Sequence, residues 1–150
     1  MTKKPINWII LLVLLCRCHV QTAPQSQLLM RSKVADLALS LTGLPYRSGG
    51  QDLDGFDCSG LVHYVFSCFG IELPRSARDQ GRLPNRIERG DAQPGDILVF
   101  HVDKGWHTGV FVGNNRFVHA PRDGAPVRLD SLNDYWQKRL KAVIVIFKEK

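Results

Sequence analysis

The sequence predicts an α+β domain in which N-terminal helices pack on an antiparallel β-sheet. Two observations support this fold class. Apolar residues recur at helical spacing in the first half of the chain, and short β-rich runs bounded by Gly, Pro, Asn and Asp follow one another in the second half. The 150 residues are about one domain in length, and a composition with 44% hydrophobic and 23% charged residues excludes a disordered or collagen-like chain.

The N-terminal segment has the pattern of a signal peptide. Lys3 and Lys4 precede an uninterrupted apolar run, residues 8–15, which is much shorter than the roughly 20 residues of a membrane-spanning helix. We therefore expect an exported protein that acts in the periplasm or the cell envelope. The expected organisation is a signal peptide, a linker and a folded domain, in residues 1–18, 19–27 and 28–150.

Two cysteines at the end of the apolar run are candidate lipidation sites of a bacterial lipoprotein. They are Cys16 and Cys18. Small residues are expected before a lipid-accepting cysteine, whereas Leu15 and Arg17 precede these two. A lipid anchor in the outer membrane is therefore one alternative, and it is the only contact with a membrane that we expect.

The charge of the chain argues against a nucleic-acid partner. The net charge is +6, but three of the basic residues lie in the N-terminal segment and the others are scattered along the domain. A mildly basic domain of this kind is compatible with a polyanionic cell wall as its partner. We expect the protein to be a monomer.

Two helices are expected before the sheet. Residues 28–41 carry apolar side chains at helical spacing, and Gly43 ends that helix. The second helix starts at Cys58 and ends at Gly70. The loop between them, residues 46–50, ends in paired glycines that allow another segment to approach the backbone closely.

Cys58 lies in the first turn of the second predicted helix, where unpaired backbone N–H groups and the helix dipole favour the reactive thiolate form. Cys68 follows ten residues later, about 15 Å along the helix axis, which is too far for a disulfide bond. We expect Cys68 in the core. Cys58 is then a free thiol in an oxidising compartment, which suggests that the thiol has a function.

The second half of the chain contains four predicted strands and one short helix. The strands are residues 96–102, 106–112, 116–119 and 142–147. The helix is expected over residues 131–140, with Ser131 as its N-cap.

His107 and His119 lie on two consecutive predicted strands, and the turn between the strands decides whether they meet. A plain two-residue loop would place them on opposite faces of the sheet. A three-residue connection or a β-bulge pairs Val112 with Arg116 and Gly109 with His119. Both histidines then share one face, with their Cβ atoms about 7–8 Å apart. Only this second register supports a site made of one cysteine and two histidines.

Cys58, His107 and His119 are far apart in sequence, whereas structural zinc sites usually contain close ligand pairs such as Cys-x-x-Cys. Nucleophilic catalysis needs a cysteine, a base and a group that orients the base, and folding can assemble these from distant segments. We therefore expect catalysis with no metal and no cofactor. His101, beside Asp103 and Lys104, is expected on the surface.

Six motifs occur along the chain in an order that resembles a known family. They are Asp57-Cys58-Ser59-Gly60-Leu61-Val62, Pro45-Tyr46-Arg47-Ser48-Gly49-Gly50, Leu73-Pro74-Arg75-Ser76 with Gln80, Pro94-Gly95-Asp96, the segment 107–113 and the segment 117–120. Together they resemble the NlpC-type cysteine peptidases of the bacterial cell wall over about residues 28–147. The resemblance implies a papain-like core, with Cys58 as nucleophile, His107 as general base and His119 as the group that orients His107.

The resemblance also implies roles for three residues near the nucleophile. Tyr46 matches a family tyrosine that helps to hold the substrate or the oxyanion, although it could equally be an aromatic residue packed beside a turn. Asp57 either caps the helix or meets a substrate amine, and capping is the interpretation that we favour. Ser59 is expected to be a polar residue of the helix start, although its backbone N–H group and that of Cys58 could supply the oxyanion donors.

The activity that the resemblance implies is that of a peptidoglycan endopeptidase. Such enzymes cut amide bonds in murein stem peptides, either at γ-D-Glu-diaminopimelate or at the D-Ala-diaminopimelate cross-link. Two alternatives remain open from the sequence. One is a non-catalytic wall-binding module, and the other is an acyl or amide transferase that uses the same cysteine.

Overall fold

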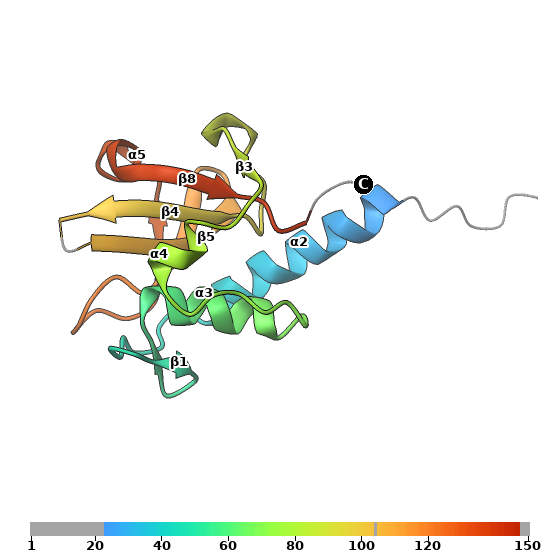
Figure 1. The fold of residues 1–150 in the computed structure, drawn as a ribbon. Coiled ribbons are helices and arrows are strands. Elements are labelled where there is room, and N and C mark those ends of the chain that lie inside the picture. The colour runs from blue at the N-terminus through green and yellow to red at the C-terminus, as the bar shows by residue number, and fades with distance from the viewer. Residues whose placement is uncertain (1–22, 104, 148–150) are drawn as a thin grey trace, which may run out of the picture.

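The computed structural model describes residues 23–103 and 105–147 and has helices packed on an antiparallel sheet, which confirms the predicted α+β fold class (Figure 1). The helices are α2 (Ala23–Ser40), α3 (Cys58–Ser67), α4 (Ala77–Gln80), α5 (Asp134–Arg139) and the 3-10 helix η1 (Arg89–Asp91). The strands are β1 (Gln51–Asp52), β2 (Gly55–Phe56), β3 (Arg86–Ile87), β4 (Ile97–Val102), β5 (Gly105–Gly113), β6 (Arg116–His119), β7 (Arg128–Ser131) and β8 (Leu140–Ile144).

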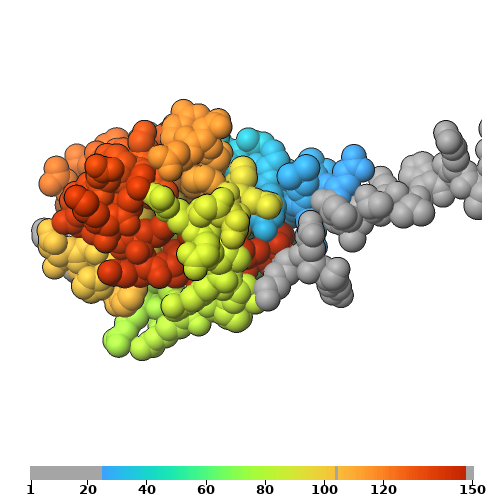
Figure 2. Space-filling model, turned by 90° about the horizontal axis from the view of Figure 1, so that it is seen from above, coloured from blue at the N-terminus to red at the C-terminus, as the bar shows by residue number. Residues whose placement is uncertain are grey.

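The main sheet has six strands in the order β3-β8-β4-β5-β6-β7, and every neighbouring pair is antiparallel. β1 and β2 form a separate small hairpin. In the space-filling view the segment around β3 lies beside the C-terminal segment, as the pairing of β3 with β8 requires (Figure 2).

The two faces of the sheet carry different apolar clusters because side chains alternate along each strand. Ile97 and Val99 face α2 and α3, whereas Leu98 and Phe100 belong to a second cluster. Trp136 of α5 packs on Phe100 in this second cluster, with 4.9 Å between the ring centroids. The sheet is therefore covered by α2 and α3 on one face and by α5 on the other (Figure 1).

The N-terminal predictions can be followed only in part. The expected signal peptide, residues 1–18, and the lipidation candidates Cys16 and Cys18 lie outside the described residues. α2 begins at Ala23, so residues 23–27 are helical instead of forming part of the expected linker. Within residues 23–103 and 105–147, no helix combines the length and the apolar character needed to cross a bilayer.

The second predicted helix ends earlier than expected. α3 runs from Cys58 to Ser67, and Cys68 is its C-cap. The prediction that Cys68 lies in the core is wrong, because the side chain leaves the helix at its last turn and is exposed to solvent.

The C-terminal region contains a strand that the sequence analysis missed. β7 pairs with β6 and ends at Ser131, so the prediction that Ser131 is a helix N-cap is wrong. The N-cap of α5 is Asn133, whose side chain accepts a hydrogen bond of 3.3 Å from the backbone N–H of Trp136. β8 follows α5 directly and is displaced towards the N-terminus from the predicted residues 142–147.

The turn between β5 and β6 is a two-residue loop. Asn114 and Asn115 both have positive φ, 50° and 55°, as a type I′ turn requires. Gly113 therefore pairs with Arg116, and the predicted pairing of Val112 with Arg116 is wrong.

A β-bulge next to this turn nevertheless produces the register that brings the histidines together. The register shifts between Phe111 and Gly113, so Phe111 pairs with Phe117 and Val112 is the extra residue. Two residues further from the turn on each strand, Gly109 faces His119. A Cβ atom at Gly109 would lie 3.1 Å from the His119 Cβ atom. The bulge that the sequence analysis considered is thus confirmed, in combination with the shorter loop.

A buried ion pair joins α2 to the start of β4. The Arg31 guanidinium lies 2.6 Å from the Asp96 carboxylate and donates a hydrogen bond of 2.7 Å to the carbonyl oxygen of Phe147. The side chain of Asp96 is fully buried and also accepts a hydrogen bond from the backbone N–H of Gln93. One guanidinium therefore connects the first described helix, the sheet and the C-terminal segment.

We predict that Arg31→Met lowers the free energy of unfolding by about 3 kcal/mol, because it leaves the buried Asp96 carboxylate without its cation. Urea unfolding at pH 7 measures this difference. Lys33→Met on the exposed side of the same helix is the matched control and should change stability by less than about 0.5 kcal/mol. Equal effects of the two substitutions would contradict the structural importance of the ion pair.

Candidate active site

The first turn of α3 holds Cys58 against the preceding loop. Asp57 is the N-cap and accepts a hydrogen bond of 2.7 Å from the backbone N–H of Gly60, which confirms the predicted capping role. A Cβ atom at Gly60 would lie only 2.0 Å from the carbonyl oxygen of Gly50, so this helical position requires a glycine. The position of Cys58 is therefore fixed both by the cap and by close backbone packing.

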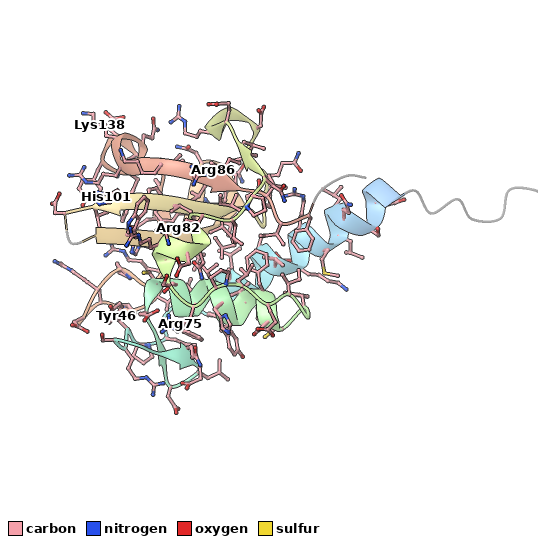
Figure 3. The ribbon with its side chains drawn as sticks, in the orientation of Figure 1. Tyr46, Arg75, Arg82, Arg86, His101 and Lys138 are labelled. Atoms are coloured by element: carbon pink, nitrogen blue, oxygen red, sulfur yellow. The ribbon has the colours of Figure 1, made fainter. Side chains whose placement is uncertain are left out.

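Arg75 adds a second fixed contact at the helix start. Its guanidinium donates to both carboxylate oxygens of Asp57, at 2.8 and 2.7 Å, and to the hydroxyl oxygen of Ser59 at 3.0 Å. Figure 3 shows Tyr46 and Arg75 beside the first turn of α3. The Asp57 carboxylate is thus already paired within the protein.

Gln80 of α4 connects the cysteine turn to the histidine strand. Its fully buried side chain donates a hydrogen bond of 3.0 Å to the carbonyl oxygen of Ser59 and accepts one of 2.9 Å from the Thr108 hydroxyl. Cys58 and His107 are the chain neighbours of these two residues. The amide of Gln80 therefore sets the spacing between the two segments that carry the predicted nucleophile and base.

His107 and His119 are in direct contact on the face of the sheet that α5 covers. Nε2 of His107 lies 2.8 Å from Nδ1 of His119. His107 pairs with Phe100 across β4 and β5, and His119 faces Gly109, which has no side chain to occupy the same space. The two predicted histidines therefore meet as the second register required.

Two polar residues extend this contact and were missed by the sequence analysis. Nε2 of His119 lies 3.0 Å from the Oδ2 atom of Asp130, and Arg128 donates to the same oxygen at 3.1 and 2.9 Å. Both residues belong to β7, and Arg128 pairs directly with His119. The alternation of polar and apolar residues from Val127 to Asp130 was the available signal for this strand.

Trp136 covers both imidazole rings. Its ring is stacked on His107 at a centroid distance of 5.5 Å and meets His119 edge-on at 5.0 Å. His119 is fully buried and His107 is 6% exposed. The tryptophan, also missed from the sequence, therefore keeps water away from the contact between the two histidines.

Burial keeps both imidazoles neutral. The pKa of His107 is lowered to about 3, mainly by burial and also by the nearby His119, while the charge of Asp130 opposes the change. Burial also lowers the pKa of His119 to about 4, although the hydrogen bond to Asp130 favours the charged form. Near pH 7 each ring therefore carries one N–H group and one basic nitrogen.

Burial raises the pKa of the Cys58 thiol above its ordinary value of 9.0, and backbone hydrogen bonds involving Thr108 and Ser59 offset only part of this rise. The negative charge of Asp57 raises it further. The backbone N–H groups at the helix start do favour the thiolate, as expected, but burial outweighs their contribution and the net pKa of the thiol is raised. The resting site contains a neutral thiol and a neutral base.

Two cavities meet at Cys58. One has a volume of about 520 Å³ and is lined by Cys58, His107, Arg122 and Asp123, among others. The other, of about 590 Å³, lies beside Asp57, Ser59 and Arg75. The residues that line both are Tyr46, Cys58 and Trp106. An extended chain could therefore pass over the sulfur with one part in each cavity.

Tyr46 and Trp106, which line both cavities beside Cys58, differ in how far they are exposed to solvent. Tyr46 is half-buried, packs against the apolar cluster beneath α3 and lines both cavities, and its role towards a substrate or an oxyanion stays a prediction. Burial raises the pKa of Tyr46, with further contributions from the nearby Cys58 and Asp57, so its hydroxyl remains a hydrogen-bond donor. Trp106, next to His107 in sequence, is 41% exposed and was not singled out from the sequence.

The arrangement is suited to acyl transfer through sulfur. A thiol and a neutral imidazole line one cavity, the imidazole is held by a second ring, and the backbone N–H groups of Cys58 and Ser59 lie at a helix N-terminus. In the part of the chain that the structure describes, no cluster of three or more His, Cys, Asp or Glu side chains has a metal-binding arrangement.

Comparisons with known proteins identify the family of this chain. A sequence model described as the NlpC/P60 family matches residues 43–145. The murein DD-endopeptidase MepS/murein LD-carboxypeptidase of Escherichia coli strain K12 is 37% identical over 113 residues, which cover 73% of this chain and 60% of that protein. The chain thus matches about 60% of the length of this curated relative.

Solved structures support the papain-like α+β fold. A NlpC/P60 family protein from Bacillus cereus superposes with a TM-score of 0.74 at 25% identity, covering 79% of this chain and 40% of that one. The NlpC/p60 domain of the peptidoglycan hydrolase SagA gives a TM-score of 0.69 at 26% identity, covering 77% of this chain and 98% of that one.

We predict that stability falls as the pH drops below 6.5. The unfolded chain binds protons on its histidines near pH 6.5, whereas folded His119 and His107 do so only at about 4 and about 3. Between pH 7 and pH 5, each histidine should lower the free energy of unfolding by an amount on the order of 1–2 kcal/mol. Urea unfolding at both pH values tests this. The variant His119→Asn should show a weaker pH dependence, and an unchanged dependence would contradict the assignment.

We also predict that alkylation of Cys58 by iodoacetamide is slow near pH 7 and accelerates about tenfold per pH unit up to at least pH 9, because the raised thiol pKa leaves little thiolate at neutral pH. Mass analysis of the Cys58 peptide over time gives the rate. A rate that is already maximal at pH 6 would instead indicate a resting thiolate.

Proposed function

Because the chain belongs to the NlpC/P60 family, we propose that it is a cysteine-type endopeptidase that cuts amide bonds in peptidoglycan stem peptides. The observation that carries the proposal is the hydrogen-bonded pair of His107 and His119 beside the cavity that contains Cys58. The name of the Escherichia coli relative supports murein as the substrate class. It also favours the D-Ala-diaminopimelate cross-link over the γ-D-Glu-diaminopimelate bond.

In the proposed reaction, His107 removes the thiol proton as the sulfur of Cys58 attacks the scissile carbonyl carbon. The oxyanion forms beside the backbone N–H groups of Cys58 and Ser59, with the Tyr46 hydroxyl as a further donor. His107 then protonates the leaving amine, and a thioester remains on Cys58. Water, deprotonated by His107, hydrolyses the thioester, which releases the acid and restores the thiol.

The neutral resting pair suits this sequence of proton transfers. His107 has its basic nitrogen available at neutral pH because burial lowers its pKa to about 3. Proton transfer to His107 accompanies sulfur attack, and the cation that forms is stabilised through His119 and the negative charge of Asp130. The charge separation therefore arises during the reaction and not before the substrate binds.

The proposed location is the cell envelope, where peptidoglycan is found. The expected signal peptide in residues 1–18 and lipid attachment at Cys16 or Cys18 form part of this proposal. Neither the wall-binding module nor the transferase accounts better for the site, and the products of a digest distinguish all three functions.

We predict that Cys58→Ala lowers peptide release from purified peptidoglycan by more than about 1000-fold, because no other group replaces the sulfur nucleophile. Cys68→Ala, which removes an exposed thiol from the far end of the same helix, should retain activity within about twofold. Circular dichroism checks that both variants fold.

Mass spectrometry of the released fragments identifies the bond that is cut. Products that carry the elements of water support an endopeptidase, and products joined to an added amine support a transferase. Binding to peptidoglycan without any cleavage would support the wall-binding module. Continued peptide release by Cys58→Ala would refute Cys58 as the nucleophile.

A further inference from the structure

Hydrogen bonds connect Asp130, His119 and His107 in a chain, and each bond in the chain has a fixed donor and acceptor. Asp130 accepts two hydrogen bonds from Arg128, and the Nε2 atom of His119 lies 3.0 Å from the same oxygen, Oδ2. Although partial burial raises the pKa of Asp130, hydrogen bonds from Arg128 and His119 lower it overall. Asp130 is therefore an ionised carboxylate, which can only accept hydrogen bonds.

This acceptor determines where the protons lie on both imidazoles. The hydrogen atom of neutral His119 must be on Nε2, facing Asp130, so Nδ1 of His119 is an acceptor. The Nε2 atom of His107, 2.8 Å away, must then be the donor to that acceptor. In a neutral ring the remaining nitrogen, Nδ1 of His107, carries the lone pair that a general base needs.

We propose that Asp130 is a positioning residue that selects the tautomers of His119 and His107 and thereby keeps Nδ1 of His107 basic. The inference rests on the proposed function, in which His107 takes the proton from Cys58. It goes beyond that function because it makes a residue on a third strand, β7, responsible for which nitrogen of each imidazole carries the hydrogen atom.

The surroundings of His119 leave few alternatives to this direction. The ring is fully buried, Trp136 lies edge-on against it, and Gly109 faces it from β5. Without Asp130, the Nε2–H group would be a buried donor without its acceptor, which favours transfer of the hydrogen atom to Nδ1. The Nδ1–H group of His119 would then face the Nε2–H group of His107, donor against donor, unless His107 changed its tautomer as well.

Variants of Asp130 separate the acceptor from the charge. Asp130→Leu removes both, and we expect kcat to fall by about 10–100-fold with little change in KM. Asp130→Asn should retain most of the activity, because Arg128 donates to the oxygen that faces His119 and will orient the amide oxygen towards the ring. Asp130→Asn combined with Arg128→Leu frees the amide to rotate, and this double variant should lose activity as Asp130→Leu does.

The matched control is Asp134→Leu, which removes an exposed acidic side chain from the start of α5 and should leave kcat unchanged. Equal activity of Asp130→Leu and the control would overturn the proposal. So would a double variant that is as active as Asp130→Asn alone.

Nitrogen-15 NMR of the histidine side chains tests the proposal without relying on activity. The wild-type chain should show the Nε2–H tautomer for both His119 and His107 near pH 7, and Asp130→Leu should shift His119 towards Nδ1–H. An Nδ1–H tautomer of His119 in the wild-type chain, or tautomers that do not respond to Asp130→Leu, would overturn it. Because this result does not depend on Cys58, failure of the tautomer assignment is distinguishable from failure of the proposed peptidase activity.

Discussion

The single extra residue in β5 is the constraint on which the site depends. Without the bulge at Val112, the two-residue turn would pair His119 with Val110. Because side chains alternate between the two faces of a sheet, the imidazoles of His107 and His119 would then lie on opposite faces. With the bulge, Gly109 faces His119, and the imidazole of His107 is within hydrogen-bonding distance of its partner. A local irregularity of the backbone thus decides whether the site exists.

Burial then decides the charge state of the site. The helix N-terminus alone would favour a thiolate, and Asp130 alone would favour a charged imidazole, but both effects are smaller than the cost of placing a charge in the covered site. Trp136 contributes to that cost by covering both histidines. Because Trp136 also excludes water, electrostatic interactions within the site are stronger. A positive charge that forms on an imidazole during a reaction is therefore attracted strongly by the nearby carboxylate of Asp130.

The sequence predicted the fold class and the three central residues of the candidate site because these depend on local patterns and on a family resemblance. The N-cap at Asp57, the helix that starts at Cys58 and the two histidine strands all follow from short-range periodicity. The role of the bulge could be stated only as an alternative, because the local sequence does not fix the register in which β5 and β6 pair.

The missed parts depend on contacts between distant segments. Asp130 was hidden because β7 has only four residues and is stabilised by pairing with β6, and its last residue was mistaken for a helix cap. The resting charge of Cys58 could not be predicted either, since the extent of burial is a property of the folded chain. Trp136 illustrates the same limit, because one short helix gives no indication of which face of the sheet it covers.

The ion pair between Arg31 and Asp96 shows that the limits of a family and the limits of a folding unit need not coincide. The family match begins at residue 43, after α2 has ended, yet Arg31 on that helix neutralises a fully buried acid at the start of β4. A fragment trimmed to the matched residues would contain all the chemistry and lack the cation that its interior requires. For this chain, the smallest autonomous unit has to be defined by its internal charge balance.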